Sequence, residues 1–341
     1  SNEALKSRSG LHIKSHGNIE VTNNLFFKNR LSINSAICIK EEVNADLADG
    51  IVNFNYNTIE NVGDVKTGIF LIEKNYPFSI DHNIIKECVV SHYSTQITTS
   101  QSSELVITNL TFKDCQAGAR SGGAFGLWMT FKDRTGTLTL VDCRFEHNSA
   151  IVDNQHPSDS CQPSGDGGGF AVGNVSIENM ALIADNCTFI NNHAAGYGGA
   201  LSIQSTLAAT IKNCTFTNNQ AERGGGAIYI SPTLFKGSSY SPLPSCTILG
   251  CKFDLNNDIS NKGHAIYFSF ANDCTTIIKI DECEFTDNYN SESTTTPGGF
   301  TISCDSPTLN ITNTKIEFTN PSFSTTGLKV EEHTETLTID G

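Results

Sequence analysis

The chain has 341 residues, of which 38% are hydrophobic and only 17% are charged. That apolar fraction is enough for a core, and the low charge leaves Ser, Thr, Asn and Gly to cover most of the surface. The balance of 22 basic and 36 acidic residues gives a net charge of −14, so nucleic acid and anionic membranes are poor partners. No apolar run approaches the roughly 20 residues that span a bilayer, so we expect no direct membrane insertion of this segment.

The two ends of the chain resemble interrupted copies of a longer pattern. Residues Ser1–Glu3 include no initiator Met, and neither a basic leader nor an apolar signal segment follows them. Leu11–Ile13 and Thr336–Asp340 each look like part of a further repeat. We therefore expect a fragment of a longer array, or a cap at one end.

The chain is built of repeats. Segments 186–203 and 213–230 carry the same pattern at an offset of 27 residues, and one apolar column recurs through the whole sequence. The members of that column are Phe26, Ile59, Ile85, Phe112, Phe145, Phe189, Phe216, Phe253, Phe285 and Ile316. The residue five positions earlier is apolar in every copy, from Val21 to Ile311. A recurring period of this length is typical of stacked repeats.

Within each repeat, apolar and polar residues alternate with the period of a strand, as in Thr137–Leu140. Gly, Asn, Asp and Pro separate these runs, and helix-forming patterns are scarce. We predict an all-β fold, a right-handed parallel β-helix of about ten turns, in a single domain over residues 1–341. With a rise of roughly 4.8 Å per turn, the rod would be about 50 Å long.

The Phe of the column belongs to a Phe-x-x-Asn motif. The copies that we expect to be structural are Phe145/Asn148, Phe189/Asn192, Phe216/Asn219, Phe253/Asn256 and Phe285/Asn288, with a further copy at Phe26/Asn29. The Phe rings should form an internal stack, and the Asn side chains should form a hydrogen-bonded ladder from turn to turn.

A second motif, Gly-Gly-Ala, is expected at a corner of each turn. It occurs at Gly122/Gly123, Gly198/Gly199 and Gly225/Gly226, with looser versions at Gly168–Phe170, Gly263–Ala265 and Gly298–Phe300. Glycine permits positive φ there, and its missing side chain lets successive corners approach closely. His264, in one of the looser versions, is expected to be a turn substitution.

Together these motifs resemble the polymorphic outer membrane proteins of chlamydiae, with their GGA(I/L/V) and FxxN repeats, and related surface proteins of some parasitic protists. Turns two and three depart from the pattern, with Ile59 and Ile85 for Phe and with Val62 and Cys88 for Asn. The resemblance implies an extracellular or cell-surface β-helical passenger, in chlamydiae part of an outer-membrane autotransporter, that acts in host-cell adhesion and virulence.

Two repeats carry extra residues, at 149–166 and 231–244. Insertions in a repeat array become loops, and loops often carry binding surfaces. Phe235 and Tyr240 in the second insertion are candidate binding residues, and the single tryptophan, Trp128, is a third. The alternative is that both insertions are decoration without a partner.

Five of the twelve cysteines recur at one repeat position, and none forms a zinc-ribbon pair. For the column Cys143, Cys187, Cys214, Cys251 and Cys283 we favour a buried stack, with one or two disulfides and a metal as alternatives. The better disulfide candidates are Cys88 with Cys115, in neighbouring turns, and the group Cys246, Cys274 and Cys304 near the starts and ends of adjacent turns. We expect no metal site and no cofactor.

Five glycosylation sequons would be used only in a eukaryotic secretory pathway, and several are expected by chance in so Asn- and Thr-rich a chain. They begin at Asn109, Asn174, Asn186, Asn213 and Asn310.

Because many β-helices are polysaccharide lyases or hydrolases, we searched the outward positions for stacked carboxylates. The best catalytic candidates are Glu87, Asp114 and His147, at one offset in three consecutive turns. Lys86 and Lys113 beside them favour ordinary surface ion pairs. The sequence favours an adhesin, not an enzyme, that binds a host-cell or cell-surface protein or glycan; an enzyme and a structural spacer are the alternatives.

Overall fold

The structure is a computed structural model, and the residues that it describes lie in short ranges along the chain. These ranges are 3–4, 11–14, 18–27, 30–31, 37–40, 51–62, 70–73, 78–90, 95–98, 104–118, 125–130, 135–151, 165–172, 179–204, 208–231, 245–260, 263–269, 275–288, 300–303, 306–312, 315–317, 328–331 and 336–340.

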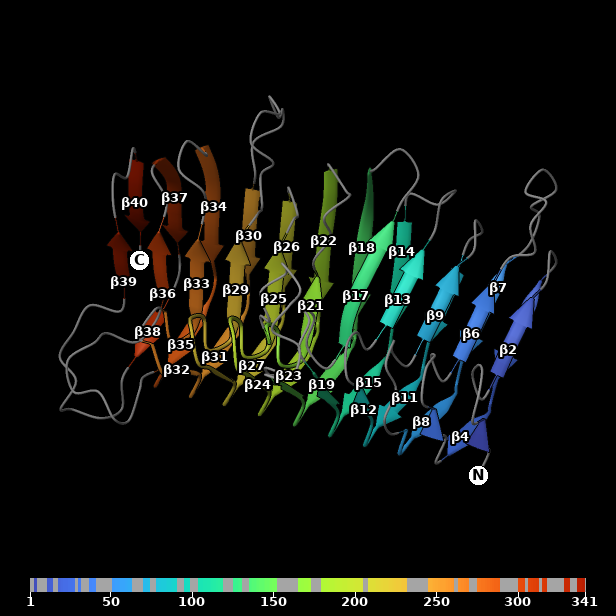
Figure 1. Ribbon diagram of the computed structural model, residues 1–341. Coiled ribbons are helices and arrows are strands. Elements are labelled where there is room, and N and C mark those ends of the chain that lie inside the picture. The colour runs from blue at the N-terminus through green and yellow to red at the C-terminus, as the bar shows by residue number, and fades with distance from the viewer. Residues whose placement is uncertain are drawn as a thin grey trace, which may run out of the picture.

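Within these ranges the secondary structure is entirely β, and no helix is long and apolar enough to cross a membrane. Three long parallel sheets and one shorter sheet run along the molecule (Figure 1). Sheet 1 holds β2 (Leu11–Lys14), β6 (Ile37–Lys40), β9 (Phe70–Glu73), β13 (Thr95–Thr98), β17 (Phe125–Thr130), β21 (Phe170–Val172), β25 (Leu201–Gln204), β29 (Ile228–Ser231), β33 (Ile266–Ser269), β36 (Phe300–Ser303) and β39 (Leu328–Glu331). Sheet 2 holds β3 (Ile19–Thr22), β7 (Val52–Asn55), β10 (Phe78–Asp81), β14 (Glu104–Thr108), β18 (Thr135–Val141), β22 (Asn179–Asp185), β26 (Ala208–Lys212), β30 (Ser245–Leu249), β34 (Thr275–Asp281), β37 (Ser306–Thr312) and β40 (Thr336–Asp340).

The other sheets are narrower. Sheet 3 holds β4 (Leu25–Phe27), β8 (Thr58–Glu60), β11 (Ile84–Lys86), β15 (Thr111–Lys113), β19 (Arg144–Glu146), β23 (Thr188–Ile190), β27 (Thr215–Thr217), β31 (Lys252–Asp254), β35 (Glu284–Thr286) and β38 (Lys315–Glu317). Sheet 4 holds β12 (Val89–Val90), β16 (Gln116–Ala117), β20 (Ser149–Ala150), β24 (His193–Ala194), β28 (Gln220–Ala221) and β32 (Asn257–Asp258). Near the N-terminus, β1 (Glu3–Ala4) pairs with β5 (Arg30–Leu31).

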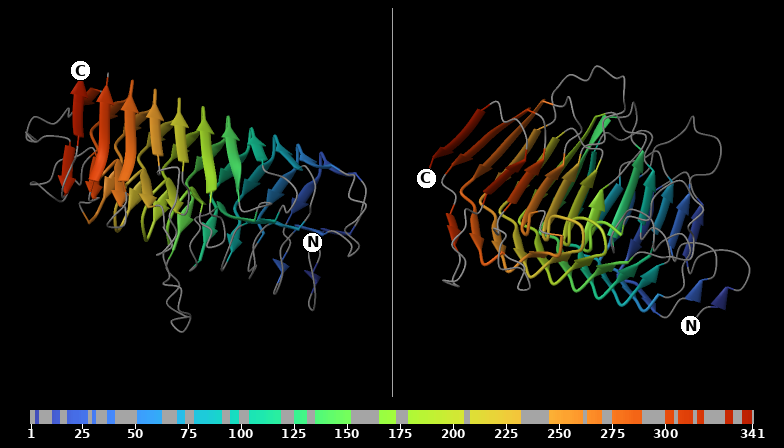
Figure 2. Two further views of the ribbon diagram at one scale, coloured as in Figure 1. Left: turned by 90° about the horizontal axis from the view of Figure 1, so that it is seen from above. Right: turned by 60° about the vertical axis from the view of Figure 1, so that its left-hand side comes forward.

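The chain visits the sheets in a fixed order, so each circuit lays one strand on every long sheet. Both views in Figure 2 show the strands of successive circuits side by side along one axis, with the two termini at opposite ends. The last strands, β39 and β40, begin a further circuit on sheets 1 and 2. The prediction of a parallel β-helix is confirmed, and so is the extra turn at Thr336–Asp340.

The predicted register is confirmed strand by strand. In sheet 3, Phe26 pairs with Ile59, Ile85 with Phe112, and the column continues to Ile316. In sheet 2, Val21 begins the other predicted column, which continues to Ile311. Because a slip of one residue would turn every apolar side chain outward, burial fixes this register.

The core contains an ordered aromatic stack. Phe145, Phe189, Phe216, Phe253 and Phe285 lie ring over ring, with centroids 4.6 to 4.9 Å apart and planes within 8° of parallel. All five are buried. The predicted internal stack is confirmed, and its spacing is that of neighbouring strands.

A ladder of buried Asn side chains follows the stack, as predicted. Each Asn accepts a hydrogen bond at Oδ1 from the backbone N–H of the Asn one turn earlier, as between Asn192 and Asn219 at 3.0 Å. Its Nδ2 donates to the carbonyl of a Phe in the preceding turn, as from Asn219 to Phe189 at 3.0 Å. The ladder runs through Asn148, Asn192, Asn219, Asn256 and Asn288.

The five-cysteine column is a buried stack of free thiols. Each Sγ lies 3.2 to 3.4 Å from the carbonyl oxygen two residues earlier. Cys88 and Cys115, the candidate disulfide pair, are both free thiols, and each Sγ lies 3.2 Å from the carbonyl oxygen two residues earlier. Adjacent strands place the Cβ atoms one strand spacing apart, slightly beyond the separation that a disulfide needs.

The two glycines of each corner motif have different roles. The first supplies the predicted positive φ, which is 69° at Gly198 and 66° at Gly225. For the second glycine that prediction is wrong, because neither Gly199 nor Gly226 has a positive φ. A Cβ on Gly199 would instead lie 2.1 Å from the carbonyl oxygen of Gly226, and one on Gly226 would lie 2.1 Å from that of His264. The predicted close approach of successive corners is therefore confirmed, and at the second position it alone requires glycine.

The looser copy of the corner motif before Gly198 needs a correction of register. There the positive-φ glycine is Gly167, with φ of 67°, so this copy begins one residue earlier than Gly168. Gly168 takes the close-approach position, where a Cβ would lie 2.3 Å from the carbonyl oxygen of Gly199. Gly122 and Gly123 lie outside the described residues.

Candidate functional site

The three predicted catalytic residues lie on one outer corner of the rod, between sheets 3 and 4. Glu87, Asp114 and His147 have φ of 54°, 53° and 52°, so each occupies the left-handed turn position of its circuit. The Oδ1 atom of Asp114 lies 3.6 Å from Nδ1 of His147. Glu87 stands one turn before Asp114 in the same column. The structure thus brings Asp114 and His147 together on an exposed corner.

The ring of His147 is held from both sides. Asn218 donates from Nδ2 to Oδ1 of Asn191 at 2.6 Å, which leaves the Nδ2 atom of Asn191 facing Nε2 of His147 at 2.8 Å. With Nε2 as the acceptor, the ring proton lies on Nδ1, which is 3.4 Å from Oε1 of Glu146 and 3.6 Å from Oδ1 of Asp114. A general base needs a free nitrogen, and here Nε2 is already bonded. The row forms an exposed polar ladder along the corner.

A hollow of about 270 Å³ lies further along the outer face of sheet 3, between Lys252 and Thr286. Asp254 contributes to its wall, and partial burial together with the charges of Asp287 and Glu284 raises the pKa of that carboxyl. The hollow is three turns from His147, so it does not enclose the predicted catalytic residues.

In the part of the chain that the structure describes, no three His, Cys, Asp or Glu side chains are placed to hold a metal ion.

Most of each predicted insertion lies outside the described residues. This includes 152–164, 232–244 and the candidate binding residues Phe235 and Tyr240. The first insertion was predicted to begin at Ser149, but Ser149–Ala150 forms β20, because sheet 4 takes a two-residue strand after each corner. For Trp128 only the backbone is described, in β17, where it pairs with Gln96.

The described residue at the end of the first insertion is firmly anchored. Asp166 is buried and accepts hydrogen bonds from the backbone N–H of Tyr197 at 2.8 Å and from Nε2 of Gln204 at 2.6 Å. The Tyr197 ring stacks on Tyr229 at 4.4 Å, and β29 ends two residues later at Ser231, where the second insertion begins. Both insertions therefore join the rod at one aromatic cluster outside sheet 1.

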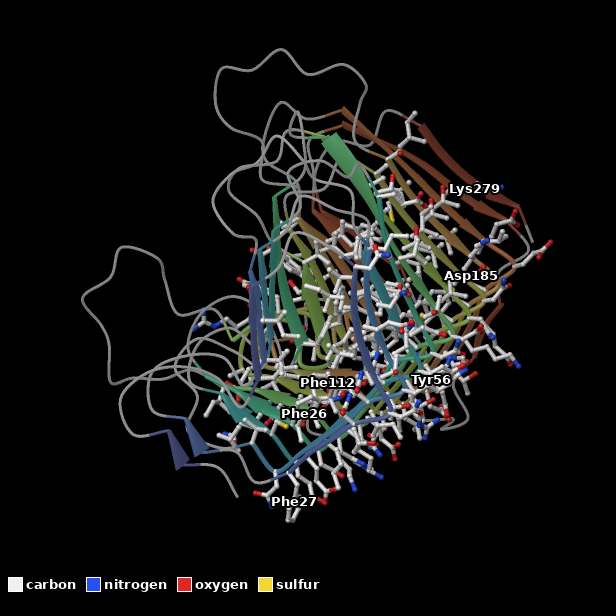
Figure 3. The ribbon with its side chains drawn as sticks, turned by 90° about the vertical axis from the view of Figure 1, so that its right-hand side faces the viewer. Phe26, Phe27, Tyr56, Phe112, Asp185 and Lys279 are labelled. Atoms are coloured by element: carbon white, nitrogen blue, oxygen red, sulfur yellow. The ribbon has the colours of Figure 1, made fainter. Side chains whose placement is uncertain are left out.

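An exposed apolar patch covers the first three turns of sheet 3. Leu25, Tyr56, Ile84 and Phe27 are 64%, 54%, 43% and 42% exposed. Figure 3 shows Phe27 and Tyr56 pointing outward, whereas Phe26 and Phe112 point into the interior. We call Leu25, Phe27, Tyr56, His82 and Ile84 the N-terminal patch. Exposed patches of a few hundred Å² commonly mark interaction sites.

A family model for the right-handed β-helix region matches residues 2–233. The chain belongs to the right-handed β-helix family. The predicted fold class and handedness are therefore confirmed. A search of curated proteins and a search of solved structures each gave no match.

Two rings form the edge of the N-terminal patch on this right-handed β-helix. Tyr56 and His82 stack with centroids 4.7 Å apart and planes 15° from parallel, and Nδ1 of His82 lies 2.7 Å from Oδ2 of Asp81. Hydrogen bonds to Asp81 from Thr108, Asn109 and His82 outweigh its partial burial and lower the pKa of its carboxyl. This contact with Asp81 orients the imidazole beneath the tyrosine ring.

Sequence reasoning missed this patch because it followed the inward columns. The outward position two residues after each left-handed corner is Thr in four turns, but Leu25 and Ile84 occupy it on either side of Thr58 at the N-terminal end. Comparing that outward column from turn to turn would have revealed the change from polar to apolar.

Proposed function

We propose that this β-helix is a surface-displayed or secreted adhesin that binds a protein on a host cell or other cell surface through the N-terminal patch. One observation carries the proposal: Leu25 and Ile84 are exposed on either side of Thr58 on the outer face of sheet 3, and the exposed Tyr56 lies at the adjoining corner. The resemblance of the repeat motifs to the polymorphic outer membrane proteins supports an extracellular passenger, and the family membership supports its β-helical rod.

The patch has the energetics of a modest protein contact. Burying one of its large side chains against a partner contributes roughly 1–2 kcal/mol, so the group can supply a useful share of an affinity. Beside it, Lys86 pairs with Glu60 at 3.1 Å, which leaves little net charge at the rim. An acidic partner would thus be repelled less here than elsewhere on a chain of net charge −14.

The two insertions are proposed to add contacts from the side. Their described ends join the rod at the Asp166–Tyr197–Tyr229 cluster, so both insertions are attached at a packed part of the rod. Weak contacts at two places on a rigid body gain from effective concentration, because the second contact forms within the same complex.

The decisive experiment replaces Leu25 and Ile84 together by Thr, the residue at the same position in four other turns. The double variant should fold normally and lose tenfold or more in binding to host cells, measured by flow cytometry. Ile277→Thr is the control, because Ile277 is exposed to nearly the same extent as Ile84 but lies on sheet 2, away from the patch. Unchanged binding by the double variant would contradict the assignment to the patch.

Deleting Ser231–Pro244 tests the loop contribution separately, and we expect a smaller loss of binding. A well-folded chain that binds no cell or glycan would contradict the adhesin proposal and favour a structural spacer. Turnover of an acidic polysaccharide, abolished by His147→Asn, would instead favour the enzyme.

A further inference from the structure

Three of the sequons fall at one structural position, the left-handed corner between sheets 2 and 3. Asn109, Asn186 and Asn213 have φ of 50°, 52° and 54°. In each, the middle residue is buried and the Thr begins a strand of sheet 3. Asn tolerates this left-handed backbone and Thr favours a strand, so the conformation of this corner favours the residues of a sequon.

At two of these corners the acceptor is open to solvent. Asn186 and Asn213 are exposed, and Thr188 and Thr215 lie beside them on the outer face. The Nδ2 atom of Asn186 donates to Oδ1 of Asp142 at 2.6 Å, and that of Asn213 donates to Oδ1 of Asp185 at 3.1 Å. Each amide uses one of its two hydrogens in that bond.

We propose that Asn186 and Asn213 are acceptor sites for N-linked glycans when the chain passes through a eukaryotic secretory pathway. The inference needs the secretion that the proposed function assumes, and nothing else from it. The co-reactant is a lipid-linked diphosphate oligosaccharide. The bond from sugar C1 to the phosphate oxygen breaks, C1 bonds to Nδ2, one amide hydrogen leaves as a proton, and the lipid diphosphate departs.

The folded chain accommodates the product at both corners. The second amide hydrogen remains, so the bonds to Asp142 and Asp185 survive modification. The sugar projects into solvent, as a bulky surface modification requires. Asn109 is excluded, because it is half-buried and Asp81, its acceptor, also accepts a bond from Thr108.

Glycans at Asn186 and Asn213 would lie on the same corner of the rod as two residues of the N-terminal patch. Tyr56 and His82 occupy the same corner as Asn186 and Asn213, in turns two and three against turns six and seven. His82 and Asn186 are three strand spacings apart, about 15 Å. Glycans in the middle of the corner would shield it and leave the N-terminal end open to a protein partner.

The test expresses the full chain behind a signal peptide in a eukaryotic cell line, followed by glycopeptide mapping and enzymatic deglycosylation. Wild type should carry glycan at Asn186 and Asn213, and so should the Thr188→Ser and Thr215→Ser variants, which keep the hydroxyl. Thr188→Val and Thr215→Val should lose the glycan at their own site, although Asn and its bond to Asp are untouched. Material retained in the cell is mapped in the same way, so poor secretion of a variant does not obscure the result.

Wild-type chain unmodified at both positions overturns the inference, and modification at one position upholds it there and overturns it at the other. Native deglycosylation should leave the thermal midpoint unchanged, and a large shift would overturn the claim that the fold accommodates the glycan. A glycosylated chain that binds no cell would contradict the adhesin proposal while leaving this inference intact.

Discussion

At the scale of single residues, Asn and Cys exchange for each other in two corner columns. Between sheets 2 and 3, Asn57 and Asn83 precede the five cysteines, and Asn57 Nδ2 donates to the carbonyl two residues earlier, as the Cys143 thiol does. Between sheets 3 and 4 the order is reversed, with Cys115 before Asn148, whose Oδ1 accepts the Cys115 N–H at 3.0 Å. Both side chains are small donors that also accept, which suits a buried corner, although apolar Leu110 and Val62 occupy the same columns in other turns.

This exchange predicts that Cys214→Asn will change the free energy of unfolding by less than about 1 kcal/mol, because Asn fills the same column elsewhere. Asn219→Leu should cost at least about 2 kcal/mol, since it leaves the buried Asn192 N–H and Phe189 carbonyl without that partner. Urea unfolding followed by circular dichroism measures both. Asn218→Gly, at the exposed neighbouring position, is the control, and equal losses in all three variants would refute the ladder's role.

His264 takes the place of the second glycine at its corner. Asp258 belongs to β32, the last strand of sheet 4 among the described residues, and it donates its N–H to Nδ1 of His264 at 3.1 Å. The imidazole thus bonds a backbone group at the end of that sheet. Burial lowers the pKa of His264 from 6.5 to about 4.

The low pKa predicts acid sensitivity. As pH falls from about 6.5 to about 4, the unfolded chain takes up a proton at this residue and the folded chain does not. The free energy of unfolding should therefore fall by up to about 1.4 kcal/mol per pH unit across that window. His264→Gln, which keeps an acceptor and cannot be protonated here, should flatten the pH profile of urea unfolding. An unaltered slope would show that His264 is not the titrating group.

At the scale of elements, the second glycine of each corner decides how closely successive circuits approach. A Cβ on Gly226 would meet backbone atoms of two neighbouring segments, His264 O at 2.1 Å and Asn257 O at 2.5 Å. Backbone cannot move aside as a side chain can, so the strands on both sides of the corner depend on this residue. Gly250 lies at another corner, with φ of 59°. The nearest atom to a Cβ on Gly250 would be the side-chain oxygen of Asn213, at 3.1 Å.

Gly226→Ala should therefore lower the free energy of unfolding by more than about 2 kcal/mol, since sheet 1 must shift to admit the methyl group. Gly250→Asn should be nearly neutral, because Asn occupies that corner in Asn186 and Asn213. Thermal unfolding of both variants distinguishes a close approach from a mere preference for glycine.

At the scale of the whole molecule, the β-helix is a one-dimensional stack. Each circuit contacts mainly the circuits before and after it, so stability accumulates from nearest-neighbour pairing and end circuits have one neighbour only. The buried Phe stack and the Asn ladder both run through the turns from Phe145 to Phe285. The central turns should thus open last.

Hydrogen exchange should show this gradient. Amides of β23 and β27 should exchange at least tenfold more slowly than those of β4, because opening them breaks contacts on both sides. Uniform protection along the rod would indicate a single cooperative unit instead.

The repeat, strand register, Phe stack and Asn ladder were all predictable from the sequence, because a parallel coil places residues of equal offset above one another. That rule also placed Glu87, Asp114 and His147 correctly in one column. It could not reveal whether such a column faces a cleft, which depends on the shape of the outer surface.

The amino-acid sequence by itself determined the coil, because each circuit must bury one apolar face against the next and only one register does so. Only the tertiary structure decided the surface: that Leu25, Tyr56 and Ile84 gather on one face, and that residues of two distant insertions meet at Tyr197 and Tyr229. Burial does not constrain outward side chains, so their exposure and their contacts across the surface are known only from the three-dimensional structure.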